Sequence, residues 1–173
     1  MAEETGGTGL GHRSVSMTRV DKGVFDVTNV RGGTMRIGGD GAEFTPVELL
    51  LAAIAGCTAI DVDYITSKRV DPETFTVTAE GDKLRDPDGN FMGGLQVRFS
   101  ITFPEGEAGD QARERLPGAV RRSHDRLCTV SRTVELGTPI DTRLADDAAA
   151  ERPDGERPDG EGSGSERAAA TEG

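Results

Sequence analysis

The chain has 173 residues, of which 29% are charged, 34% hydrophobic and only 4% aromatic, and its formal net charge is −11. So acidic a balance argues against nucleic acid or an anionic membrane as a partner. The apolar run at 49–60 is too short to span a bilayer, and no signal peptide is visible. Two cysteines are too few for a secreted disulfide scaffold. We therefore expect a cytoplasmic protein.

Three regions are expected along the chain. Residues 1–12 are rich in glycine and glutamate and are predicted to be disordered, whereas residues 13–144 have the patterning of a folded domain. Residues 145–173 contain nine acids and three arginines and are predicted to form a disordered acidic tail, in which the segment ERPDG at 151–155 repeats at 156–160.

The domain opens with strand-like alternation. Residues 13–20 and 23–30 alternate around the turn Asp21-Lys22-Gly23, which predicts a hairpin. Residues 34–37, set between two glycine pairs, predict a third short strand. The glycine-rich loop that follows precedes a helix start and so resembles an anion-binding loop, but glycines in this place usually form turns, and no phosphate-binding motif is present.

The stretch TPVELLLAAIAGC, from Thr45 to Cys57, predicts the start of a long helix. Thr45, Pro46 and Glu48 have the spacing of a capping box with proline at the first helical position. We expect the helix to run from Pro46 to about Lys68. Because it is apolar on every side over its first half, it is predicted to be buried and to bring Cys57 into the core.

A second hairpin is predicted after this helix. Residues 74–84 and 95–103 alternate between apolar and polar side chains, and the segment DPDGN between them is a strong turn signal.

The remainder of the domain is predicted to be mainly helical. Residues 108–127 have helical character, and Pro117 within them either starts a second helix or kinks a single one. Residues 129–135 extend the helical region. Residues 139–144 predict a short closing strand. The fold class is therefore α+β with a mainly antiparallel sheet. Because one domain with so few aromatics struggles to cover the apolar helix, we expect a homodimer with that helix at its centre.

The two cysteines, Cys57 and Cys128, have no motif spacing, and the pattern alone favours two buried structural residues, with a functional pair as the alternative. Cys57 lies too far from the helix start for the helix dipole to favour its thiolate, and Asp61 on the same face would oppose it. An activating cation must then come from elsewhere in the fold. The candidates are Arg36, Arg31, Arg19 and Arg132.

Other ligand sets are less favoured. His124 stands four residues before Cys128 and could activate that thiol, although its polar neighbours favour a surface histidine. A zinc site built from Cys57, Cys128, His124 and Asp61 lacks the close ligand spacing of known sites. We therefore expect no metal.

The sequences TPVELLLAAIAGCTAIDV around Cys57 and CTVSRT at Cys128 together resemble the OsmC/Ohr family of osmotically inducible and organic-hydroperoxide-resistance proteins, over about residues 13–144. The resemblance implies an OsmC-like α+β fold with a long central helix and a second helical segment, in an intertwined homodimer. It implies reduction of organic hydroperoxides and hydrogen peroxide without a metal or organic cofactor. Cys57 would be the peroxidatic cysteine and Cys128 the resolving one, and a dithiol reductant, a lipoylated protein in some members, would reopen their disulfide.

One position departs from the family's peroxidases, which carry a glutamate ten residues before the peroxidatic cysteine that orients an arginine. Here that position is Val47, and Glu48 follows one residue later with a capping role; the sequence is more similar to a less characterised OsmC branch. Glu48 and Arg36 are nevertheless retained as candidate catalytic residues. The departure also motivates an alternative function, a non-catalytic redox sensor or small-ligand-binding module with the same dimeric fold.

Overall fold

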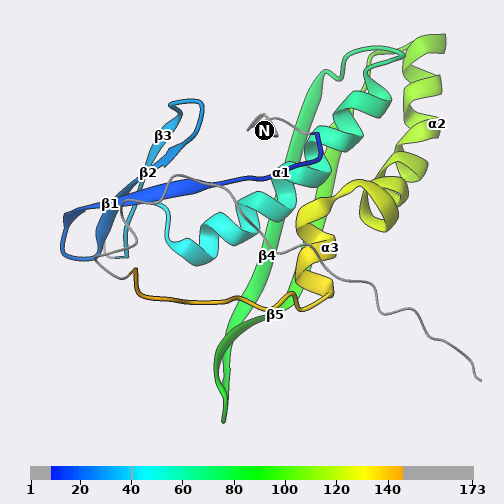
Figure 1. The fold of residues 1–173 in the computed structure, drawn as a ribbon. Coiled ribbons are helices and arrows are strands. Elements are labelled where there is room, and N and C mark those ends of the chain that lie inside the picture. The colour runs from blue at the N-terminus through cyan, green and yellow to red at the C-terminus, as the bar shows by residue number, and fades with distance from the viewer. Residues whose placement is uncertain (1–8, 40, 146–173) are drawn as a thin grey trace, which may run out of the picture. The chain divides into compact units, whose positions relative to one another are not determined.

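The computed structural model describes residues 9–39 and 41–145, which divide between Thr138 and Pro139 into two units. The segments 1–8 and 146–173, which contain most of the predicted disordered ends, lie outside the described residues. The first unit contains five strands and four helical segments (Figure 1). In chain order they are β1 (Val15–Asp21), β2 (Val24–Asn29), β3 (Thr34–Ile37), α1 (Pro46–Thr66), β4 (Thr74–Asp86), β5 (Gly89–Thr102), α2 (Glu107–Arg122), the π-helical turn η1 (Ser123–Leu127) and α3 (Thr129–Glu135).

The N-terminal strands form an antiparallel sheet in the order β1-β2-β3. Gly23, with φ of 73°, makes the tight turn between β1 and β2, a backbone conformation that favours glycine. Apolar side chains of this sheet remain uncovered, among them Val15, Met17 and Met35, which are 66%, 51% and 43% exposed. The sheet thus has apolar surface that no other described element covers.

Helix α1 begins as predicted, with a complete capping box. The Thr45 hydroxyl accepts from the Glu48 N–H at 3.3 Å, and the Glu48 carboxylate accepts from the Thr45 N–H at 2.8 Å. The helix ends at Thr66, two residues before the predicted end. The Thr66 hydroxyl donates to the Val62 carbonyl at 2.9 Å, and the N–H of Ser67, the C-cap residue, donates to the Asp63 carbonyl at 2.9 Å.

Within a single chain, α1 is fully buried along one stripe only, which leaves open the surface that the predicted homodimer would cover. Its buried residues are Ile54, Thr58, Val62 and Thr66, which form one stripe facing β4 and α2. Among the described residues, α1 is the one helix long and apolar enough to cross a membrane, but only 22% of that apolar window is buried, and core helices of soluble proteins have the same length and composition. Within one chain, therefore, most residues of this apolar helix are only partly buried or are exposed.

The second hairpin is longer than predicted, because β4 and β5 pair up to the two-residue turn Pro87-Asp88. The Asp86 carboxylate accepts from the N–H groups of Asp88 and Gly89, both at 2.9 Å, which fixes this turn. Inside the hairpin, Phe75 and Phe99 meet edge to face with ring centroids 6.5 Å apart. The pair forms part of the face on which α1 packs.

Helix α2 runs unbroken through Pro117, so the interruption is a proline inside one helix rather than the start of a second. The chain then makes the π turn η1, in which the Cys128 N–H donates to the Ser123 carbonyl at 2.9 Å, before α3 starts. The predicted closing strand 139–144 is wrong. This segment has no regular structure and leaves Ile140 89% and Leu144 96% exposed, because alternation without a strand partner does not make a sheet.

Candidate functional site

The structure brings the two cysteines together from distant parts of the chain. Cys57 lies in the second half of α1 and is half-buried, while Cys128 ends η1 and caps α3, with only 2% of its surface exposed. The Cys57 thiol lies close enough to the Cys128 thiol, and to the backbone N–H groups of Thr129 and Val130 at the start of α3, for these groups to shift its pKa. The two sulfurs are therefore placed for a thiol pair.

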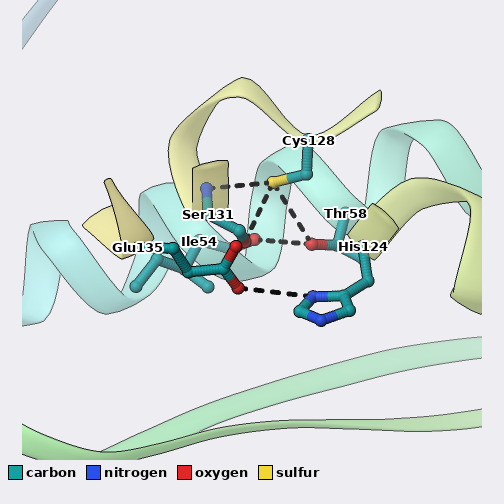
Figure 2. Close-up of polar contacts among 6 residues, drawn as sticks. All are labelled: Ile54, Thr58, His124, Cys128, Ser131 and Glu135. Atoms are coloured by element: carbon teal, nitrogen blue, oxygen red, sulfur yellow. Dashed lines mark hydrogen bonds and ion pairs between the residues drawn. The ribbon is translucent and has the colours of Figure 1, made fainter. Parts of the chain in front are cut away.

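The sulfur of Cys128 lies in a cluster of hydrogen-bonding groups (Figure 2). The Ser131 N–H donates to Sγ at 3.4 Å, and the Ser131 Oγ lies 3.1 Å from it. The Thr58 Oγ1 lies 3.6 Å from the same sulfur and 3.0 Å from the Ile54 carbonyl oxygen. Because a hydroxyl has one proton, Thr58 can donate to only one of these acceptors at a time.

These surroundings shift the two thiols in opposite directions. Burial raises the pKa of the Cys57 thiol, the neighbouring Cys128 adds to the rise, and the backbone N–H groups at α3 oppose it only in part. Burial also acts to raise the pKa of Cys128, but hydrogen bonds from Ser131, Thr58 and Cys57 outweigh it, so the pKa of this thiol is lowered. Of the pair, Cys128 is the better thiolate in a single chain.

The π turn fixes where Cys128 lies relative to α1. Ser123 begins this turn and is fully buried, and its hydroxyl donates to the Asp61 carboxylate at 2.8 Å. Asp61 thus holds η1 against α1, one helical turn beyond Cys57. This contact positions Cys128 next to Cys57, which gives Asp61 a structural role beside the cysteine pair.

A cavity of about 410 Å³ lies next to the Cys128 cluster, between α1, the β4–β5 hairpin, the end of α2, η1 and α3. Thr58 and Ser131, the two hydroxyl residues at the Cys128 sulfur, are part of its wall. The rest of the wall is mainly apolar, with His124 and Glu135 as a polar pair 3.8 Å apart. Its apolar residues are Leu51, Ile54, Ala79, Leu95, Val97, Phe99, Val120 and Val134.

The other predicted site residues lie apart from the cysteines. Arg36 on β3 pairs with Asp26 on β2, at 2.7 Å between Nε and Oδ1, on the exposed N-terminal sheet. Glu48 caps α1, nine residues before Cys57, which is about 13.5 Å along the helix axis. In a single chain, therefore, neither Arg36 nor Glu48 is brought to the thiols.

The zinc alternative is not assembled. In the described ranges, no group of three or more His, Cys, Asp and Glu side chains is placed to hold a metal ion. Of the four residues considered, His124 is directed to Glu135 and Asp61 to Ser123.

Two residues at the site were not singled out from the sequence, Ser131 and Thr58. A signal was present for both, since Ser131 stands three residues after Cys128, the spacing of a helix cap, and Thr58 directly follows Cys57. Which sulfur each would approach depends on how η1 and α1 pack, and spacing alone does not give that.

Together the fold and the site define an α+β protein with a pair of adjacent thiols on a helical scaffold. A match to the family described as OsmC-like protein covers residues 39–143, so the chain belongs to the OsmC-like protein family. Among curated proteins, an uncharacterised protein of Mycobacterium tuberculosis H37Rv is 26% identical over 124 residues, covering 70% of this chain and 88% of that protein.

Solved structures agree in fold. A hypothetical protein from Aquifex aeolicus VF5 superposes with a TM-score of 0.60 at 21% identity, covering 75% of this chain and 91% of that one. A Legionella pneumophila protein described as an organic hydroperoxide resistance protein OsmC superposes with a TM-score of 0.52 at 17% identity, covering 73% and 90%.

Proposed function

We propose that this protein is a thiol-dependent hydroperoxide reductase in which Cys57 is the peroxidatic cysteine and Cys128 the resolving one. The observation that carries the proposal is that the two thiols, 71 positions apart in the chain, lie close enough at the junction of α1 and α3 to influence each other. The mainly apolar cavity beside them suits the organic part of a hydroperoxide. Membership of a family that includes a protein described as conferring organic hydroperoxide resistance adds support.

The chemistry needs only the two sulfurs, a hydroperoxide and a dithiol. The Cys57 thiolate attacks the terminal oxygen of the hydroperoxide, the O–O bond breaks, and the alkoxide leaves and takes up a proton to become the alcohol. Cys57 is then a sulfenic acid. The Cys128 thiolate attacks the Cys57 sulfur, the S–O bond breaks, and hydroxide leaves as water after protonation. A dithiol reduces the resulting disulfide and is itself oxidised.

The raised pKa of Cys57 requires a source of positive charge for the first step. We propose that a homodimer supplies it, with arginines of the N-terminal sheet reaching the partner's thiols. Two features support this arrangement: the uncovered apolar surface of that sheet and the exposed face of α1. Arg36 remains our first candidate, since it would need only to exchange Asp26 for the partner's site.

The test is peroxide consumption. Purified protein is mixed with cumene hydroperoxide and dithiothreitol, and the remaining peroxide is followed for wild type, Cys57→Ser and Cys128→Ser. We expect turnover by wild type and none by Cys57→Ser. With dithiothreitol left out, Cys128→Ser should consume one equivalent of peroxide and leave a sulfenic acid trappable by dimedone. The exposed Thr133→Val variant on α3 is the matched control and should behave as wild type. No consumption above background by wild type would refute the proposal.

A second function, redox sensing or ligand binding without turnover, is favoured by two observations: burial raises the Cys57 pKa, and Val47 stands where the family's peroxidases carry an acid. One equivalent of peroxide followed by intact mass measurement separates the two cases. Loss of two hydrogens without turnover would favour a sensor, and no reaction at all would favour a binding role for the cavity.

A further inference from the structure

The two sulfurs of the pair differ in their surroundings. Cys128 is 2% exposed, and its sulfur meets the Ser131 N–H, the Ser131 hydroxyl and the Thr58 hydroxyl. Cys57 is half-buried and is the more exposed residue of the two. An incoming thiolate reaches a disulfide along the line of the S–S bond, so access and the stability of the leaving thiolate decide which sulfur it attacks.

The hydrogen-bond donors around Cys128 are placed to stabilise a charge on its sulfur when the disulfide breaks. Negative charge then develops on the sulfur that leaves, and hydrogen-bond donors held next to it stabilise it. The Ser131 N–H already donates to this sulfur. The Ser131 hydroxyl, which accepts the thiol proton in the reduced protein, and the Thr58 hydroxyl, which donates to the Ile54 carbonyl, can each turn a proton to the charged sulfur. Cys57 meets the N–H groups of Thr129 and Val130, but it is the sulfur that lies open to attack.

We propose that Ser131 and Thr58 are positioning residues that make Cys128 the leaving thiolate, so that the dithiol reductant attacks Cys57 and forms its mixed disulfide there. This inference rests on the proposed function, because it concerns the reductive half of that reaction. In that half of the reaction, Ser131 and Thr58 direct the reductant, and the Cys57 sulfur receives it.

The reductant thiolate attacks the Cys57 sulfur, a new S–S bond forms between them, and the Cys57–Cys128 bond breaks with its electron pair on Cys128. The second thiol of the reductant, deprotonated, attacks its own linked sulfur, closes a cyclic disulfide and releases Cys57, which takes up a proton. The dithiol loses two electrons and the protein disulfide gains them.

The opposite shifts of the two thiols agree with this polarity, because the pKa of Cys128 is lowered and that of Cys57 is raised. A thiol of lower pKa is the better leaving group in disulfide exchange. The other titratable groups that line the adjacent cavity are His124, Glu135 and Glu80.

The first experiment locates the adduct in wild-type protein. The disulfide is formed with diamide, exposed briefly to 2-mercaptoethanol, and quenched in acidic urea containing N-ethylmaleimide, and peptide masses show which cysteine carries mercaptoethanol. We expect at least a tenfold excess on Cys57, with N-ethylmaleimide on Cys128. An excess on Cys128, or equal labelling, would overturn the inference.

The second experiment tests the positioning residues. Ser131→Ala should slow reduction of the diamide-formed disulfide by dithiothreitol about three- to tenfold, since it removes one hydrogen bond to a developing thiolate. Thr58→Val should act in the same direction, and Thr133→Val on the same helix should have no effect. In a Cys57→Ser background, Ser131→Ala should move the thiolate absorbance titration of Cys128 to higher pH, and Ser131→Thr should restore it. Unchanged rates and titration would contradict the assignment.

These experiments separate the inference from the proposed function. Diamide replaces the hydroperoxide, so a protein that consumes no peroxide still reports which sulfur the reductant attacks. If diamide fails to form the disulfide, the inference falls, whatever the peroxide assay gives. The adduct position uses wild-type protein and does not depend on whether any variant folds.

Discussion

Replacing Ile60 by aspartate tests the proposed dimer on the face of α1 that the chain leaves open. At about 100° per residue, Ile60 and Tyr64 point away from the buried stripe of α1, and they are 50% and 67% exposed. Fully burying an isoleucine side chain contributes about 2 kcal/mol, so covering the exposed half of Ile60 contributes about 1 kcal/mol. A symmetric interface uses the residue twice, which gives about 2 kcal/mol, or roughly 30-fold in the dimer dissociation constant.

Aspartate adds the cost of burying a carboxylate, so 30-fold is a lower bound for Ile60→Asp. Sedimentation equilibrium over a range of concentrations measures the dissociation constant, and circular dichroism checks that α1 is intact. Ile140→Asp is the matched control, because Ile140 is 89% exposed and lies outside the helices and strands. A monomeric wild type, or a variant that dimerises as tightly as wild type, would show that this face of α1 is not the interface.

Three further predictions concern stability. Thr45→Ala removes the α1 cap and should lower the free energy of unfolding by about 1 kcal/mol in urea titrations, with Thr45→Ser close to wild type. Val62 is fully buried, so Val62→Ala should cost about 2 kcal/mol from lost burial and the cavity left behind; a cost near zero would contradict the packing. The hydrogen bond from Arg36 lowers the pKa of Asp26, so this pair stabilises the fold at pH values above the ordinary aspartate pKa. The stabilisation is lost as the pH falls through the lowered pKa of Asp26. Asp26→Asn should therefore lose less unfolding free energy between neutral and acidic pH than wild type does.

Local signals in the sequence were sufficient for most of the fold. The capping box at Thr45, the turn at Gly23 and the alternation of β4 each depend on residues close in the chain, and each element forms where it was predicted. The closing strand at 139–144 failed because a strand also needs a partner, which alternation cannot supply. The apolar pattern of α1 indicates in the same way that the helix needs cover; one chain supplies this cover along a single stripe, and cover by a second copy stays a prediction.

The candidate site was predictable only in part. The family resemblance singled out Cys57 and Cys128, and the structure places these two thiols close enough to influence each other. The opposite pKa shifts of the pair, and the hydroxyls of Thr58 and Ser131 that help to cause them, depend on the packing of α1 against η1 and α3. Such packing joins residues about 70 positions apart, and no local pattern encodes it.

The π turn at Ser123–Leu127 has a consequence for how this segment can change during evolution. The buried Ser123 is fixed to Asp61 at one end, and Cys128 is fixed against α1 at the other. Losing or gaining one residue between them would turn the start of α3 by about 100° and carry the sulfur away from Cys57. Substitutions at the exposed positions of the turn leave that geometry unchanged, so the segment is constrained in length far more than in composition.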